Sequence, residues 1–260
     1  LQLEHLLVGD DFNPEVGFVR RRDMRRSFAD VRFSPRPQSI ALVRRFVWNG
    51  SFAYVENLAG QVETRDATGA FTLELENSDQ LAITGTRTYE FLPQPFQIAR
   101  DVTLPVGGYD FTDVEVAYSI GEHRRVNGQL SVQRGGYFNG DITAFAFRQG
   151  RVAVLPQLSI EPSVSVNWID TLEGSFRTEL LVTRLNYAFN PRMFFSGLIQ
   201  YNSANDTVSN NLRFRWEYSP GSELFVVYTE DHTMNPLRPN RVADLRNRGL
   251  VIKFNRLFRY

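Results

Sequence analysis

Hydrophobic and polar residues alternate along most of the chain. From Asn211 to Ser219 every second side chain is apolar or aromatic, and this set is Leu212, Phe214, Trp216 and Tyr218. The same alternation runs through Ser159–Trp168, Arg125–Arg134 and Phe71–Glu76. Because a β-strand directs successive side chains to opposite faces, the pattern predicts strands with one apolar and one polar face.

Turn-forming residues separate these runs at the spacing of a β-meander. They are Asn49-Gly50, Ala67-Thr68-Gly69, Asn77-Ser78-Asp79, Gly107-Gly108, Asn139-Gly140-Asp141, Asn190-Pro191, Asn205-Asp206 and Ser219-Pro220-Gly221-Ser222. Between them lie about fifteen or sixteen candidate strands, many of about 9 to 14 residues, whereas a typical soluble strand has roughly five or six. A tilted strand needs roughly 9–11 residues to cross a bilayer, so these lengths favour transmembrane strands.

Aromatic residues near the turns distinguish a membrane barrel from a soluble β-sandwich, in which strands also alternate. Those within a few residues of a turn are Trp168, Tyr187, Phe189, Tyr201, Trp216, Tyr218 and Tyr228. Aromatic girdles of this kind lie at the two membrane interfaces of a barrel. The polar faces carry charge in mid-strand, at Glu115, Glu161, Glu179, Arg213 and Arg215, which suits a hydrated lumen.

The C-terminal residues form an amphipathic run that ends on an aromatic side chain. Counting back in twos from Tyr260 gives Phe258, Arg256, Phe254 and then Ile252 and Leu250. This pattern resembles the assembly signal that outer-membrane barrels present to the barrel assembly machinery, with Phe254, Phe258 and Tyr260 as its apolar positions. Arg256 departs from the pattern, but its long stem can extend to the headgroups. An ordinary edge strand is the alternative.

If the C-terminus lies on the periplasmic side, every turn is assigned to one side of the membrane. The short periplasmic turns are then Ser219–Ser222, Asn190–Arg192, Leu155–Gln157, Gly121–Arg125 and Ser34–Ser39, and the outer loops are Asp231–Asn247, Asn202–Thr207, Asp170–Gly174 and Gly135–Asp141. The longest of these, Asp231–Asn247, lies outside, as is usual for outer-membrane barrels.

Composition narrows the function classes. The 29 basic residues, 28 of them arginine beside the single Lys253, balance 29 acidic ones, so no nucleic-acid partner is expected. Without cysteine, disulfides, thiolate metal sites and thiol catalysis are excluded. No apolar run of about 18 residues is present, which excludes a transmembrane helix.

Two segments resemble a known family. They are Gly9–Asp23, which contains Asn13-Pro14-Glu15-Val16-Gly17-Phe18, and Asn210–Tyr228, which contains Trp216-Glu217-Tyr218-Ser219-Pro220-Gly221. Both are similar to domain of unknown function family 5916, a bacterial outer-membrane barrel family whose members usually carry a family-nine-type carbohydrate-binding module before the barrel. The resemblance spans essentially the whole chain and implies that it is the C-terminal part of a longer protein, with carbohydrate as a partner.

The sequence predicts no catalytic, cofactor or metal site. His5, His123 and His232 lie in separate regions without metal-ligand spacing, and no nucleophile-elbow or phosphate-binding glycine motif occurs. Acidic pairs such as Asp170 and Glu173 could serve a glycosidase, but solvated loops explain them better. His232, near Thr229 and Thr233, is the nearest candidate for a lipase-type pair, although the specific spacing is absent.

Arginine groups provide the candidate binding residues. On the polar faces, a lumen-facing ladder of ion pairs is expected from Arg177, Glu179, Glu161, Arg213, Arg215 and Glu217. In the last outer loop, the candidates for lipopolysaccharide or another ligand are Arg238, Arg241, Arg246 and Arg248, because a guanidinium binds phosphate in a bidentate manner. A second group, Arg20, Arg21, Arg22, Arg25 and Arg26, is expected to pair with nearby acids instead: Asp10, Asp11, Glu15, Asp23 and Asp30.

Residues 1–260 are therefore interpreted as a single all-β domain, an antiparallel up-and-down transmembrane β-barrel of about 14–16 strands that further strands before Leu1 could complete. The expected location is the bacterial outer membrane, where the barrel acts as an anchor or channel linked to carbohydrate binding or uptake. Its expected partners are outer-membrane lipid, lipopolysaccharide and the barrel assembly machinery. A membrane-associated glycan hydrolase and a soluble β-sandwich binding module are the alternatives.

Deletion of Phe258–Tyr260 is predicted to prevent assembly into the membrane, because it removes two of the three apolar positions of the C-terminal signal. Fractionation of cells that express the truncated chain measures this directly. Normal insertion of the truncated chain would contradict the assignment of the C-terminus as an assembly signal.

Overall fold

The computed structural model describes residues 1–19, 21–234 and 244–258. This part of the chain is all-β, as the alternation predicts. Its strands are β1 (Gln2–Val8), β2 (Met24–Phe33), β3 (Val43–Glu56), β4 (Val62–Leu75), β5 (Gln80–Leu92), β6 (Phe96–Ala99), β7 (Val102–Leu104), β8 (Gly107–Ile120), β9 (Val126–Tyr137), β10 (Gly140–Leu155), β11 (Leu158–Thr171), β12 (Gly174–Asn190), β13 (Met193–Asn202), β14 (Thr207–Ser219), β15 (Ser222–Thr233) and β16 (Asp244–Asn255).

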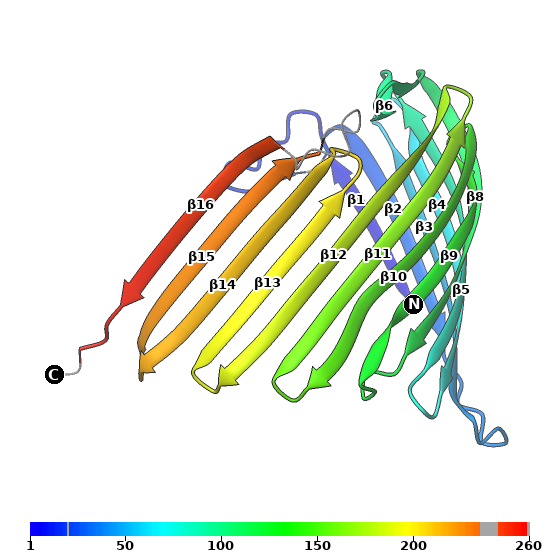
Figure 1. Ribbon diagram of the computed structural model, residues 1–260. Coiled ribbons are helices and arrows are strands. Elements are labelled where there is room, and N and C mark those ends of the chain that lie inside the picture. The colour runs from blue at the N-terminus through cyan, green and yellow to red at the C-terminus, as the bar shows by residue number, and fades with distance from the viewer. Residues whose placement is uncertain (20, 235–243, 259–260) are drawn as a thin grey trace. The chain divides into compact units, whose positions relative to one another are not determined.

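Fourteen of the described strands form one sheet in which neighbours in sequence are neighbours in space, apart from the small β6–β7 hairpin inserted between β5 and β8 (Figure 1). The pairs β1–β2, β2–β3, β3–β4, β4–β5 and β12 through β16 are antiparallel. The antiparallel meander is thus confirmed. The closed barrel is not observed, because β1 and β16 stand at the two ends of the sheet order.

The expected turns from Gly121–Arg125 to Ser219–Ser222 each span a connection between two strands, although most include residues at the strand ends. Gly107-Gly108 lies at the start of β8, the expected outer loop Asp231–Asn247 extends into β15 and β16, and two expected turns were wrong. Asn49-Gly50 lies inside β3 and Ala67-Thr68-Gly69 lies inside β4, where Gly50 is directly opposite Gly69. Neither glycine has a positive φ, so nothing in the local backbone interrupts the strand. The connection between these strands is instead Asn57–Gln61, in which Gly60 has a φ of 84°.

The chain divides into two compact units whose sequences interleave. The first unit comprises Leu1–Tyr118, Ser131–Ala144 and Trp168–Phe176, and the second comprises Ser119–Leu130, Phe145–Asn167 and Arg177–Tyr260. The interleaving arises because strands β8 to β12 each contribute residues to both units.

A small hydrophobic cluster lies in the first unit where the β6–β7 hairpin meets β8. Leu92, Leu104 and Tyr109 are buried there, and Ile98, Phe111 and Phe138 pack against them. Leu104 is the largest side chain that is fully buried among the described residues. A cluster of this size is far smaller than the core of a typical soluble domain of this length. Residues 1–19, 21–234 and 244–258 contain no helix long and apolar enough to cross a membrane.

Candidate functional site

One face of β12–β16 in the second unit is a continuous apolar surface. Directly opposite residues of an antiparallel pair project to the same face. The register therefore aligns three cross-strand rows: Leu185, Gly197, Leu212, Tyr228 and Leu250; Tyr187, Phe195, Phe214, Val226 and Ile252; and Met193, Trp216, Leu224 and Phe254. We call these rows the apolar face of the second unit. Ile252 and Phe254 are 63% exposed, so the surface is not covered by the rest of the chain.

Aromatic side chains gather at the turn-proximal end of this face. The ring of Tyr218 stacks on Phe254 with centroids 5.2 Å apart, and the Tyr218 hydroxyl donates to the carbonyl oxygen of Asn255 at 2.9 Å. Trp216 meets Tyr218 edge to face at 6.0 Å. Phe189 meets Phe214 in the same way at 6.4 Å. These contacts bring together residues that the sequence assigned to an aromatic girdle.

The opposite face of β11–β15 is polar and internally hydrogen-bonded. Glu161 accepts a hydrogen bond from the Asn186 amide at 3.0 Å and lies 3.6 Å from the guanidinium of Arg184. Asn186 in turn accepts from the Ser196 hydroxyl at 3.0 Å, and Ser196 is directly opposite Arg213. We call the side of the sheet that carries this network the polar face of the second unit.

Arg213, Arg215 and Glu217 share this polar face, as predicted. Arg213 donates through Nε to Asn211 at 2.9 Å, and Arg215 forms an ion pair with Glu223. Arg215 also lies over the ring of Phe225, 5.7 Å from its centroid. Cross-strand carboxylates thus pair with Arg184 and Arg215, whereas Arg213 donates to the neutral side-chain amide of Asn211.

Arg177 and Glu179 do not join this group. They form an ion pair with each other at 2.5 Å. Arg177 and Glu179 precede Leu181 in β12 by four and two residues, and Leu181 is opposite Tyr201 on the apolar face. Side chains two apart in a continuous strand share a face, so this pair lies at the end of the apolar face. The single ladder expected from the sequence is thus divided between two faces.

Burial is inverted along β9. The polar side chains Asn127 and Ser131 are buried, at 6% and 4% exposure, whereas the apolar Val126, Leu130 and Val132 are 53%, 41% and 51% exposed. Soluble domains show the reverse, since buried polar groups require partners and exposed apolar groups contact water. The strand therefore presents its apolar side outward.

Hydrogen bonds explain how the polar side of β9 tolerates burial. The Gln133 amide donates to Asp113 at 2.7 Å within the first unit. In the second unit, Gln129 donates to the Ser119 hydroxyl at 3.1 Å, and Asn127 donates to the Glu122 carbonyl oxygen at 3.1 Å. The inward side of the strand is thus a satisfied polar layer.

The first unit shows the same division of faces in β3–β5. One face carries a hydroxyl-rich set that comprises Ser51, Thr64, Thr68, Thr72, Thr84, Thr86 and Thr88. The other carries Phe46, Trp48, Phe71, Leu73, Leu81 and Ile83. Trp48 and Phe71 have ring centroids 5.1 Å apart. We call the second set, with the residues in line with it on β2, the apolar face of the first unit.

A charged cluster interrupts the apolar face of the second unit near its outer end. The Glu230 carboxylate accepts hydrogen bonds from the Tyr228 hydroxyl and the His232 ring, and the Arg248 guanidinium lies 3.4 Å away. Glu230 is 18% exposed, so these contacts neutralise a half-buried carboxylate. Tyr228, Glu230 and His232 share a face because they are two residues apart in β15.

The arginines assigned to the last outer loop are placed differently. Arg246 and Arg248 belong to β16, where Arg248 is directly opposite Glu230. Arg238 and Arg241 lie outside the described residues. The loop assignment failed for Arg246 and Arg248 because the β15–β16 hairpin extends further than the charged residues in it suggested, with a register shift between Asp231 and His232. Whether the four bind lipopolysaccharide remains a prediction.

Two of the three assembly-signal residues, Phe254 and Phe258, lie among the described residues. Phe254 lies in β16, and Phe258 follows the end of that strand and is 64% exposed. Tyr260 lies outside the described residues. Arg256 lies 5.1 Å from the centroid of the Phe258 ring, so the one cation in the signal packs on one of its aromatic members.

The N-terminal arginines form ion pairs, but not with the acids close to them in sequence. Arg21 pairs with Glu63 at 2.9 Å, Arg25 with Glu56 at 3.3 Å and Arg26 with Glu4 at 3.1 Å. The partners of these arginines are thus glutamates on other strands and not the acids close to them in sequence. Of the expected acids, Asp23 caps the backbone N–H of Leu58 and Asp30 accepts from Asn49. Arg20 lies outside the described residues.

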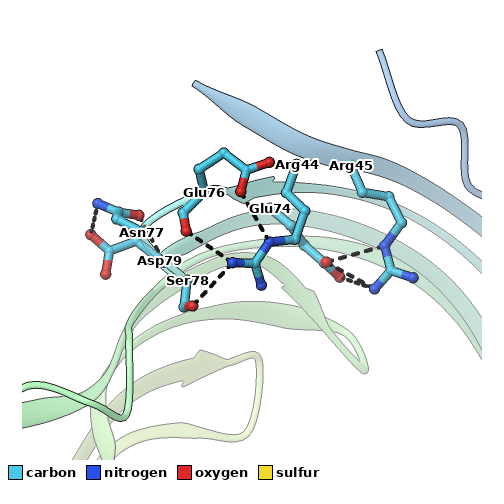
Figure 2. Close-up of polar contacts among 7 residues, drawn as sticks. All are labelled: Arg44, Arg45, Glu74, Glu76, Asn77, Ser78 and Asp79. Carbon is cyan, nitrogen blue, oxygen red and sulfur yellow. Dashed lines mark hydrogen bonds and ion pairs between the residues drawn. The ribbon is translucent and has the colours of Figure 1, made fainter. Parts of the chain in front are cut away.

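A polar cluster closes the β4–β5 turn (Figure 2). Arg45 forms an ion pair with Glu74, in which Nη2 of Arg45 lies 2.6 and 2.8 Å from the two carboxylate oxygens. Arg44 donates a hydrogen bond to the carbonyl oxygen of Glu76 at 2.9 Å. The carboxylate of Asp79, which is 2% exposed, accepts from the amide of Asn77 at 3.0 Å and the hydroxyl of Tyr118 at 2.7 Å. The sequence predicted the turn at Asn77-Ser78-Asp79. It did not predict that Asp79 is buried, because the burial involves Tyr118, which is distant in sequence but in contact with Asp79.

The metal-ligating residue types and the His232 neighbourhood were the chemical candidates that the sequence raised. The described residues contain no group of three or more His, Asp or Glu side chains that could hold a metal ion. His232 engages Glu230, whereas Thr229 and Thr233 are odd-numbered neighbours in β15 and project to the opposite face. The His–Thr pair considered from the sequence is therefore not formed.

Comparisons with known proteins found no match: no family model, curated protein or solved structure is significantly similar to the chain.

Replacement of Glu230 by Gln is predicted to loosen the β15–β16 hairpin, because Arg248 then lacks its carboxylate. Amide hydrogen exchange of residues 245–250 in detergent micelles should accelerate roughly three- to tenfold. Glu223→Gln is the matched control, since Glu223 lies in the same strand but pairs with Arg215. Equal protection of residues 245–250 in Glu230→Gln and the unaltered chain would contradict a stabilising role for the cluster.

Proposed function

We propose that the chain forms the transmembrane part of an outer-membrane β-barrel that acts as an anchor or channel for surface carbohydrate binding. The observation that carries the proposal is the inverted burial of β9, where polar Ser131 is 4% exposed and the adjacent apolar Val132 is 51% exposed. The apolar faces of both units extend the same arrangement over the neighbouring strands.

An apolar surface of this extent is costly in water and favourable in a bilayer. Each square ångström of apolar surface removed from water stabilises a protein by roughly 25 cal/mol. Exposed apolar patches beyond a few hundred square ångströms are rare on soluble monomers. In a bilayer the same surface contacts acyl chains, and the aromatic contacts of Trp216, Tyr218 and Phe254 lie near strand ends, where interfacial girdles lie.

Backbone hydrogen bonding requires that the sheet edges be satisfied. Within a hydrocarbon medium an unpaired N–H or C=O group costs several kcal/mol, so only helices and closed barrels span membranes. The edges at β1 and β16 therefore pair with each other, or with further strands, when the protein is in the membrane. This is the step from the observed open sheet to the proposed barrel.

The choice between anchor and channel depends on the polar faces. The polar face of the second unit has alternating cations and carboxylates, and that of the first unit is rich in threonine. Such faces suit a hydrated lumen. Carbohydrate as the partner rests on the resemblance to domain of unknown function family 5916. The hydrolase alternative rests on His232, which engages Glu230, and on acidic pairs such as Asp170 and Glu173, which bind Ser175 and Asn139.

A matched pair of substitutions in β9 tests membrane insertion. Val132→Arg places a charge on the outward apolar side near mid-strand, which in a barrel costs about 2–4 kcal/mol at the bilayer midplane. Gln133→Arg places the same charge on the adjacent polar side and should be tolerated. Heat-modifiable gel mobility of the detergent-extracted outer-membrane fraction measures folding. We expect the folded band to be lost in Val132→Arg and kept in Gln133→Arg.

The opposite ranking, or recovery of the unaltered chain in plain buffer without detergent, would contradict the membrane proposal. It would favour a soluble β-sandwich, in which a half-exposed valine tolerates arginine and a partly buried glutamine that is hydrogen-bonded to Asp113 does not.

Conductance in planar bilayers separates a channel from an anchor. If the chain forms a channel, stepwise conductance is expected, and Arg213→Glu should raise its cation-to-anion permeability ratio severalfold because the substitution reverses a lumenal charge. The charge-preserving Arg213→Lys is the comparison and should leave the ratio nearly unchanged. Inserted protein without conductance is the result expected of an anchor.

A further inference from the structure

A trough crosses the apolar face of the first unit. Gly50, Gly69 and Gly85 are directly opposite one another on β3, β4 and β5. Two hollows of about 420 and 440 Å³ lie on either side of this row and share Gly50 and Gly69 in their lining. Trp48, Phe71 and Ile83 form one wall, and Phe52 forms part of the other. We call this feature the glycine trough.

The glycines are not explained by backbone conformation or by packing within the chain. None of them has a positive φ. A Cβ atom added to Gly69 or Gly85 would meet nothing within 4 Å, and one added to Gly50 would only make ordinary contact with Val31. Glycine in a strand is unfavourable relative to alanine by roughly 0.5–1 kcal/mol, and often marks a place where a ligand approaches closely. Their effect here is to keep the trough open between aromatic walls.

A cationic group lies at the β5 end of the trough. Arg87 is two residues from Gly85 on the same face, and its guanidinium binds Asp110 at 2.9 and 3.0 Å. Arg65 binds the same carboxylate at 3.1 Å, so two arginines share one acid. Two further arginines, Arg21 and Arg25, pair with Glu63 and Glu56. Among the described residues of this face, the guanidinium groups of Arg65 and Arg87 thus share a single carboxylate, and the side chain of Arg87 is 64% exposed.

We propose that the glycine trough binds one acyl chain of lipid A, the phosphorylated glycolipid of the outer leaflet, with its phosphate on Arg87 and Arg65. This inference rests on the proposed function. The apolar walls of the trough suit an acyl chain, and the two guanidinium groups that share Asp110 suit an anionic phosphate. The expected periplasmic turn Ser34–Ser39 lies between β2 and β3. In a meander the next connection, between β3 and β4, lies on the opposite side of the membrane. Arg65 is close to that connection, so the arginines lie in the outer leaflet.

Native mass spectrometry of the whole chain in detergent, titrated with lipid A, tests the site. Gly69→Leu with Gly85→Leu fills the trough, and Arg87→Gln removes one of the two guanidinium groups that share Asp110. Each is expected to weaken binding about tenfold or more. Val114→Leu is the control: it adds bulk at an exposed position of β8 outside the trough lining and should leave affinity within about twofold. Heat-modifiable mobility shows that each variant is folded, and Gly69→Ala replaces the double variant if that one does not fold.

Unchanged lipid A binding by the filled trough would overturn the proposal, as would equal binding of zwitterionic phosphatidylcholine. Equal affinity for phosphatidylglycerol would overturn the assignment to lipid A. A chain that inserts and shows heat-modifiable mobility but fails these titrations leaves the proposed function standing without the lipid site. A chain that never inserts contradicts the proposed function itself.

Discussion

Backbone hydrogen bonding between long antiparallel strands is the constraint on which the rest of the structure depends. Pairing from β1 through β5 and from β12 through β16 satisfies the peptide groups by neighbouring strands alone. The sheet therefore does not need a large core to bury its polar backbone, and the cluster around Leu104 is correspondingly small. Side chains on the outward face are free to be apolar. This arrangement is stable where apolar side chains are solvated by lipid.

Charge on the outward faces is confined and compensated. Arg65 and Arg87 share Asp110, and Arg248 joins His232 on Glu230, so these charged groups have partners on a neighbouring strand or two residues along their own. Exposed ion pairs of this kind add little stability in water. Near a membrane interface they keep charged side chains compatible with an apolar surface, and the two guanidinium groups that share Asp110 suit a lipid headgroup.

Period-two alternation made the all-β antiparallel sheet, the order of the strands and most turns predictable from the sequence. It also placed Glu161, Arg213 and Arg215 on one face, since alternation within a strand is a local property. Register was not predictable. Whether Gly50 faces Gly69 or begins a turn depends on where both strands end, and the true turn at Gly60 carries a weaker signal. Ion-pair partners such as Glu63 for Arg21 likewise depend on how the strands are aligned, so acids close in sequence did not predict the partners of the arginines.

The most direct test of the outward apolar face is spin-label scanning of β14, for which the cysteine-free chain needs only single cysteine substitutions. Residues 211–218 are labelled one at a time in the protein reconstituted in vesicles, and collision rates with oxygen and with a water-soluble nickel chelate are compared. The account predicts a period of two: labels at Leu212, Phe214 and Trp216 contact oxygen more and nickel less than labels at Asn211, Arg213 and Arg215. Uniformly high nickel accessibility at Leu212, Phe214 and Trp216 would contradict it.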